Sequence, residues 1–355
     1  MVGFRRLLLL GIVVLGLVVV IGYVATSARK AEGAERRVYW GAYVGGGQYG
    51  KTDAPWDMSS AIRLETEVGK RMSLLEWGQA WYECSTWCGM RGFRADIMNR
   101  ARSGGYLPIL SWGSYVSQKG PDQPDYKLSE ILSGRYDAFI RRWARGAKAW
   151  GHPFFLRFDW EMNTNSVPYS EHSNGNRRGE FVRMWRHVHD IFEEVGARDA
   201  QWVWCPNVEY GSSVKPLSSL YPGNNYVDWV CLDGYNWGTN PARPAGWTSF
   251  DQVFRHTYDL LTKRIAPTKP LMIGEMASTE FGGSKAEWIT NAYGSAIPAR
   301  FPRVSAVVWF NKYWDDMDWP IETSASAQEA LRAAIASPVY VTNVFRSAEG
   351  PIRRR

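Results

Sequence analysis

The sequence predicts an α/β protein of the (β/α)8 TIM-barrel class, preceded by an N-terminal transmembrane or signal segment. The chain has 355 residues, which is enough for one large domain. After residue 37, short apolar strands alternate with amphipathic helical segments, and eight such strands follow one another. Near-continuous apolar strands separated by helices are typical of a parallel sheet covered by helices. Eight repeats favour a closed barrel over the alternative, an open doubly wound sheet.

The order of the elements follows from apolar runs and helical spacing. Helices are predicted over 93–105, 135–151, 181–196 and 250–264, and those over 135–151 and 181–196 end on glycine. Ligands of such barrels bind at the C-terminal ends of the strands, so we look for a site there. The predicted strands cover residues 38–44, 72–78, 106–113, 153–161, 200–207, 227–237, 270–277 and 304–311.

The two ends of the chain differ from its body. Residues 7–24 form an unbroken apolar run behind Arg5 and Arg6, long enough to span a bilayer. We therefore expect a signal anchor or signal peptide over 1–27 and a membrane-anchored or secreted protein whose folded part lies outside the cytoplasm. A linker over 28–37, a single domain over 38–340 and a basic C-terminal tail over 341–355 complete the predicted organisation.

The charge of the chain does not indicate a nucleic-acid partner. The formal net charge is +7, but the excess basic residues lie in the first 37 and the last ten positions. The body between them carries no basic stripe that could follow a phosphate backbone, so nucleic acid is excluded as a partner. The four cysteines, Cys84, Cys88, Cys205 and Cys231, permit disulfides in an exported protein, and their pairing stays open.

The stretch "GGGQYGKT" at 45–52 matches the pattern of a phosphate-binding loop. In that motif the lysine and threonine open a helix whose amides hold the phosphates. Pro55 follows too closely for a helix to begin at Lys51. We interpret 45–52 as the loop after the first strand.

Acidic residues follow two of the predicted strands. "FFLRFDWEMN" at 154–163 places Arg157, Asp159 and Glu161 along one side of its strand. "LMIGEMA" places Glu275 at the end of another strand, on the same face as Leu271 and Ile273. Two carboxylates across a cleft are what glycoside hydrolysis needs, because one protonates the leaving oxygen while the other attacks the anomeric carbon or activates water. Asp159 is a rival for the acid.

Five motifs in order, "LRFDWEMN", "WVWCPN", "VDWVCLDGYNW", "LMIGEMAS" and "VVWF", resemble glycoside hydrolase family 26, the β-mannanase family of the retaining (β/α)8-barrel clan. The resemblance covers about 38–339 and implies a catalytic domain there. It implies that Glu161 is the general acid/base, that Glu275 is the nucleophile and that Tyr235 hydrogen-bonds Glu275. It also implies that Trp309 is an aromatic platform under the sugar. We expect substrate contacts from eight residues: Trp112, Arg157, Trp160, Asn163, Trp204, Asn207, Tyr235 and Trp309.

The sequence departs from the family pattern where substrate is chosen. Mannanases usually have histidine immediately before the acid/base, and here that residue is Trp160. The resemblance implies a retaining endo-β-glycosidase acting on a polysaccharide, with β-1,4-mannan as the expected substrate. An endo-β-glucanase, a β-1,3-xylanase or a non-catalytic glycan-binding barrel are the alternatives. No cofactor or metal is expected, since proton transfer and a carboxylate nucleophile suffice.

Overall fold

The structure of the protein is a computed structural model that describes residues 37–84, 88–209, 216–241 and 246–342. The predicted N-terminal segment (1–27) and nearly all of the predicted linker and basic tail lie outside the described residues. Within the described ranges, no helix combines the length and apolar character that crossing a bilayer requires.

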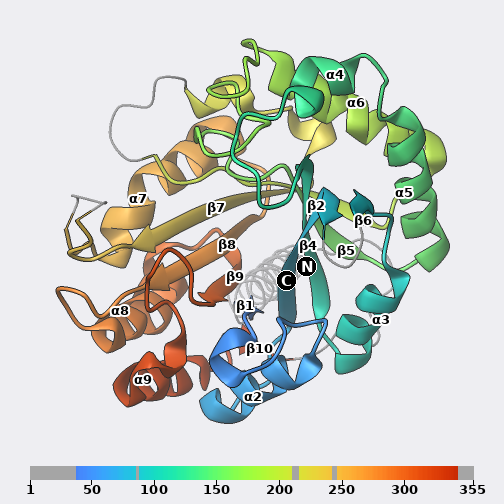
Figure 1. Ribbon diagram of the computed structural model, residues 1–355. Helices are drawn as coiled ribbons and strands as arrows, with labels where there is room; N and C mark the ends of the chain where they lie inside the picture. The colour runs from blue at the N-terminus through green and yellow to red at the C-terminus, as the bar shows by residue number, and fades with distance from the viewer. Residues whose placement is uncertain (1–36, 85–87, 210–215, 242–245, 343–355) are drawn as a thin grey trace, which may run out of the picture. The chain divides into compact units, whose positions relative to one another are not determined.

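Eight parallel strands close into a barrel with helices around it (Figure 1). Neighbouring strands pair in chain order, and the last pairs with the first, Tyr39 opposite Ala306, so the sheet has no open edge between them. The predicted barrel is confirmed, and the open-sheet alternative is wrong. The barrel strands are β1 (Val38–Val44), β2 (Leu74–Cys84), β4 (Leu107–Val116), β5 (Phe154–Phe158), β6 (Ala200–Trp204), β7 (Trp229–Asn236), β8 (Leu271–Ser278) and β9 (Val304–Asn311).

Two short strands extend the sheet beyond the barrel. β3 (Cys88–Met90) forms an antiparallel hairpin with the end of β2, and a Cys84–Cys88 disulfide links the two strands. β10 (Tyr340–Val341) pairs in parallel with the start of β1. A second disulfide joins Cys205, just after β6, to Cys231 on β7.

The helices pack their apolar faces on the outside of the barrel (Figure 1). α5 and α6 end at Gly151 and Gly196, as predicted, because both glycines take the left-handed conformation, with φ of 64° and 77°. Ser249 and Gln252 form a capping box that starts α7. The helices are α2 (Met58–Val68), α3 (Ala95–Gly104), α4 (Leu128–Leu132), α5 (Asp137–Trp150), α6 (Glu180–Val195), α7 (Phe250–Leu260), α8 (Lys285–Asn291) and α9 (Ala325–Ile335), with π-helical turns at Leu261–Ile265 and Ala292–Arg300.

The two faces of each barrel strand have different neighbours. One face packs against the helices, as Leu156 and Phe158 of β5 do. The other face points into the barrel, where Phe155 belongs to a separate apolar cluster. The barrel interior is therefore a packed core at its base, formed by residues that include Tyr39, Leu74, Leu107, Ile109, Phe155, Val203, Trp229, Met272, Ala306 and Val308.

Candidate active site

A cavity of about 1040 Å³ opens at the C-terminal ends of the barrel strands, above the apolar base of the interior. Glu161 and Glu275 both line it, although 114 positions of sequence separate them. The barrel therefore brings the two carboxylates predicted from sequence into one cavity. Aromatic side chains make up much of the remaining wall: Tyr43, Tyr115, Trp160, Tyr235, Trp237, Phe310, Trp314 and Trp319.

Glu161 reaches the cavity because the backbone leaves the strand conformation early. β5 ends at Phe158, and then Asp159 and Glu161 take positive φ values of 40° and 54°. Such conformations cost about 1–3 kcal/mol for a residue other than glycine and cluster at functional sites. The amide of Glu161 donates to the carbonyl of Cys205 at 2.7 Å, which fixes this turn against β6. The simple two-residue alternation predicted along 157–161 therefore does not continue past Arg157.

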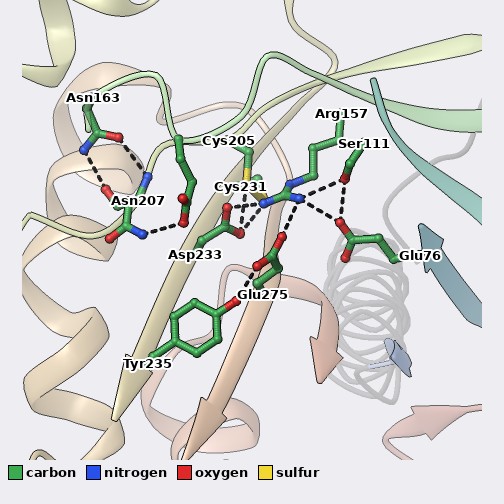
Figure 2. Close-up of a disulfide and its surroundings, with 11 residues drawn as sticks. Glu76, Ser111, Arg157, Asn163, Cys205, Asn207, Cys231, Asp233, Tyr235 and Glu275 are labelled. Atoms are coloured by element: carbon green, nitrogen blue, oxygen red, sulfur yellow. Dashed lines mark hydrogen bonds and ion pairs between the residues drawn. A yellow bond between two sulfur atoms is a disulfide. The ribbon is translucent and has the colours of Figure 1, made fainter. Parts of the chain in front are cut away.

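Two asparagines hold the carboxylate of Glu161. The side-chain amide of Asn207 donates to Glu161 Oε1. Asn207 is itself clamped, because Asn163 donates to its carbonyl at 2.8 Å and accepts from its backbone amide at 2.9 Å (Figure 2). Both asparagines line the cavity, and their contact with substrate stays a prediction.

Glu275 enters the cavity through a β-bulge in β8. Leu271 and Ile273, which share its face in a regular strand, pack outward among the helices. The pairing of β8 slips by one residue against β7, so that Leu232 lies opposite Ile273 but Asp233 lies opposite Glu275. The extra residue turns the following side chain to the other face of the sheet. The prediction that Glu275 shares a face with Leu271 and Ile273 was therefore wrong. The bulge turns Glu275 to the opposite face of β8, which lines the cavity.

The bulge requires glycine at its extra position. A Cβ on Gly274 would lie 2.4 Å from the sulfur of Cys231 and 2.9 Å from Asp233 Oδ1. No side chain fits at these distances, so the backbone of β8 approaches β7 more closely here than any other residue would allow.

Glu275 is held by two donors. Tyr235, on β7, donates its hydroxyl to Oε2, and Arg157 donates to Oε1 at 2.7 Å (Figure 2). Its side chain is only 13% exposed. A carboxylate whose two oxygens both accept hydrogen bonds is held in a fixed position.

Arg157 lies beneath the cavity and does not line it. Its side chain is fully buried and contacts Glu76 at 2.7 Å, Asp233 and Glu275. Burial alone would lower the pKa of Arg157, but the charges of these carboxylates outweigh it and hold that pKa well above its ordinary value. Its predicted direct contact with substrate is therefore wrong, and Arg157 instead positions the carboxylates from below.

Glu76, on β2, is a third carboxylate of the cavity that the sequence reasoning missed. It accepts from Ser111 and from Arg157, each at 2.7 Å, while its second oxygen, Oε2, is buried with no hydrogen-bond partner among the described residues. Burial raises the pKa of Glu76 to about 7, because the charge of Glu275 adds to it and the opposing charge of Arg157 offsets only part. The inward alternation of Leu74, Glu76 and Gly78 along β2 could have identified it.

Asp159, the rival acid, faces away from the cavity. Its two oxygens bond the backbone amide and the hydroxyl of Ser114, each at 2.7 Å. It is fully buried, and this burial raises the pKa of Asp159 to about 8, with the two hydrogen bonds from Ser114 opposing the shift. Asp159 is placed to join β4 to the turn that carries Glu161 rather than to meet substrate.

Three predicted sugar-binding tryptophans are not in the cavity. Trp112 stacks on Trp143 of α5, with ring centroids 4.5 Å apart, and is fully buried. Trp204 and Trp309 are also buried on the outer face of the barrel. All three occupy strand positions whose side chains point toward the helices, so the predicted contacts were wrong. The inward position next to Trp309 is Phe310, which does line the cavity.

Trp160 and Tyr235, in contrast, line the cavity, so their predicted contact with substrate stays open to test. The ring of Trp160 lies 5.2 Å from the guanidinium of Arg157, so a cation–π contact holds it against the polar layer beneath. Tyr235 packs against Trp319, with ring centroids 5.1 Å apart, and both belong to the aromatic wall of the cavity.

One group of potential metal ligands occurs in the part of the chain that the structure describes: Cys205, Cys231 and Asp233. The two sulfurs are joined to each other, and Asp233 is bonded to Arg157. A disulfide offers no thiolate for a metal, and the guanidinium occupies the carboxylate. These residues do not fit a metal site.

Comparisons with known proteins find two curated relatives, an endoglucanase and a mannanase. No protein-family model matches it. Endoglucanase H of Acetivibrio thermocellus is 35% identical over 286 residues, which is 78% of this chain and 29% of that protein. Mannan endo-1,4-β-mannosidase A and B of Caldalkalibacillus mannanilyticus is 29% identical over 139 residues, 39% of this chain and 23% of that protein. The chain spans less than a third of the length of either curated relative.

Solved structures agree on the fold. A GH26 β-mannanase from Bacteroides ovatus matches with a TM-score of 0.59 at 14% identity, covering 87% of this chain and 91% of that one. This likeness shows the barrel. The name of this neighbour carries the family, GH26, that the strand-end motifs resemble, and the two relatives are by name an endoglucanase and a mannanase.

Proposed function

We propose that the chain is a retaining endo-β-glycosidase in which Glu161 is the general acid/base and Glu275 the nucleophile. The observation that carries the proposal is that these two carboxylates line one cavity and are held in different ways. Glu275 accepts from a guanidinium and a phenol, whereas the side-chain amide of Asn207 donates to Glu161. This difference suits a nucleophile and a proton donor.

The reaction then proceeds in two steps. In the first, Glu275 attacks the anomeric carbon while Glu161 gives its proton to the leaving glycosidic oxygen, so that a glycosyl ester forms and the aglycone sugar departs. In the second, Glu161 takes a proton from water, the water oxygen attacks the same carbon, and Glu275 is released as a carboxylate. Two inversions leave the anomeric configuration unchanged. Tyr235 and Arg157 orient the two carboxylate oxygens of Glu275 for its attack.

Substitution of each glutamate tests the two roles separately. Glu275→Ala should lower kcat by at least about 10⁴-fold while glycan binding persists. Glu161→Ala should hydrolyse aryl glycosides with good leaving groups far better than polysaccharide, because such leaving groups need no proton. Glu193→Ala, an exposed acidic position on α6, is the matched control. Near wild-type turnover by Glu275→Ala, or product of inverted configuration by NMR, would refute the mechanism.

The backbone of the substrate is best assigned to a β-glucan. The longest match is to an endoglucanase, and Trp160 stands where the resemblance implies a histidine in mannanases. Mannan, the substrate expected from the motifs, remains the second candidate, because the shorter match is to a mannanase. Glucose and mannose differ only in the orientation of the C2 hydroxyl. Reducing ends released from mixed-linkage β-glucan, cellulose derivatives, galactomannan and β-1,3-xylan will distinguish them, and binding without release would indicate a glycan-binding barrel.

We also propose that this domain works outside the cytoplasm, either secreted or anchored. The apolar run at 7–24 and a polymeric substrate support this location, as do the two disulfides, which persist in oxidising compartments. Fractionation of cells that express the chain with and without residues 1–27 tests it. Equal retention of both forms in the cytosol would contradict the proposal.

A further inference from the structure

A half-exposed tryptophan stands at the mouth of the cavity. Among the described residues, five large apolar side chains are strongly exposed: Trp56, Ile62, Phe281, Tyr313 and Trp314. Trp314 is the most exposed of them, at 58%, and it alone of the five lines the cavity. The cavity thus ends in a large apolar surface that the protein itself leaves uncovered.

The indole of Trp314 continues a row of side chains that runs up from the cavity floor. Phe310, Lys312 and Trp314 follow one another at every second position after the interior of β9, and all three line the cavity. The ammonium of Lys312 is anchored by Asp53 at 2.7 Å and lies 5.7 Å from the Trp314 ring. The ammonium attracts the ring electrostatically, and 58% of Trp314 stays exposed to solvent.

The turn that presents Trp314 is strained and firmly anchored. Asp315 and Asp316 both have positive φ, 54° and 57°, and the amide of Met317 donates back to the carbonyl of Trp314 at 3.0 Å. A two-residue turn of this kind favours glycine, asparagine and aspartate, and here both positions are aspartate. Met317, just beyond the turn, is buried, with only 1% exposure. Strain that the surrounding structure maintains is typical of a functional position.

The segment beyond the turn is fixed by a buried lysine. Lys285, at the start of α8, donates to the carbonyls of Asp318 and Pro320 and to the hydroxyl of Thr323. Trp319, between the first two of these residues, lines the cavity and is almost fully buried. The exposed Trp314 is therefore held on a rigid base rather than on a loose loop.

We infer that Trp314 is a stacking platform for a sugar ring of the polymeric substrate, at a distance from the bond that is cleaved. This inference rests on the proposed glycosidase function. A pyranose presents a flat face of C–H groups bordered by hydroxyls, and indole offers a complementary apolar face. Asp315, which also lines the cavity, supplies a polar group for those hydroxyls. The platform would lengthen the binding site along the chain of the polymer and so favour endo cleavage.

The test compares long and short substrates. Trp314→Ala should lower kcat/KM about tenfold on the polysaccharide and on its hexasaccharide, equivalent to about 1.4 kcal/mol, and less than twofold on an aryl β-disaccharide. Trp314→Phe should restore most of the loss. Trp56→Ala is the matched control, because Trp56 is 41% exposed and does not line the cavity. Equal losses on long and short substrates would overturn the inference.

A binding measurement separates this inference from the proposed function. Calorimetry measures the affinity of the hexasaccharide for the Glu275→Ala variant and for the Glu275→Ala/Trp314→Ala double variant. The double variant should bind about tenfold more weakly. Unchanged hexasaccharide affinity would refute the role of Trp314 as a platform, whether or not the wild-type protein cleaves glycans. Absence of cleavage by the wild-type protein would refute the glycosidase proposal, and the binding result for Trp314 would still stand. A change of sedimentation with Trp314→Ala and no change of affinity would mean that the indole contacts a second copy of the chain.

Discussion

The buried carboxyl of Asp159 makes a specific prediction about pH and stability. Replacing it in Asp159→Asn keeps the shape of the group and both bonds to Ser114, because the amide oxygen can accept from the backbone and the amide nitrogen can donate to the hydroxyl. Asparagine therefore imitates the protonated acid. The variant should match the wild type at low pH and exceed it in stability at high pH.

The sign and the size follow from the pKa of Asp159. Burial raises it to about 8 in the folded protein, against about 3.9 for an unfolded chain. The folded state thus retains a proton that the unfolded state has released. The contribution of protonated Asp159 to the unfolding free energy of the wild type is fully present below about pH 4. It declines as the pH rises and is lost once the pH passes through about 8, the pKa of the folded state. A difference of about four pKa units corresponds to about 5 kcal/mol of unfolding free energy.

The assay is urea unfolding of both proteins at intervals between pH 4 and pH 9. The difference in unfolding free energy, Asp159→Asn minus wild type, should grow from about zero to several kcal/mol. Asp122→Asn, at an exposed position, should show no such growth. Parallel pH curves for Asp159→Asn and wild type would refute the reasoning. A stable but inactive Asp159→Asn protein would show that Asp159 takes part in catalysis after all.

Three further substitutions test the residues that hold Glu275, the proposed nucleophile. Tyr235→Phe removes one donor to this carboxylate and should lower kcat about 10- to 100-fold with normal folding by circular dichroism; an unchanged kcat would contradict its role. Arg157→Lys should cost about 2–4 kcal/mol in urea unfolding, because a single ammonium cannot serve three buried carboxylates; a loss below 1 kcal/mol would contradict this. Gly274→Ala should cost about 2 kcal/mol or more, whereas Gly294→Ala, which meets no atom within 4 Å, should not.

The alternation of apolar strands and amphipathic helices was sufficient to predict the barrel. All eight barrel strands overlap the ranges that the sequence predicts, because continuous apolar runs that alternate with amphipathic helices are typical of a helix-covered parallel sheet. The motif "FFLRFDWEMN" also placed Glu161 at the edge of the cavity, since β5 ends within it. Glu275 was predicted to join it from its place near the end of another strand.

The direction of individual side chains was harder to predict. Trp112, Trp204 and Trp309 are ordinary aromatic residues of strands in the sequence, and nothing local says which face of each strand meets the helices. Glu275 shows the opposite case, because strict alternation would turn it outward and only the slipped pairing between β7 and β8 brings it inward. A bulge arises from contact between strands, so it cannot be seen in one strand alone.

The sequence by itself thus determined the order of the elements, the closed parallel sheet and the position of Glu161 and Glu275 near the ends of two strands. Hydrophobic periodicity and the residues at strand ends are local properties, so a single sequence shows them. Only the tertiary structure decided that Glu76, Asp233 and Glu275 share one buried arginine, and that Asp159 bonds Ser114 instead of facing the cavity. These arrangements, and the pKa values that follow from them, depend on burial and on distances between charges from separate strands. Such distances exist only once the barrel has closed.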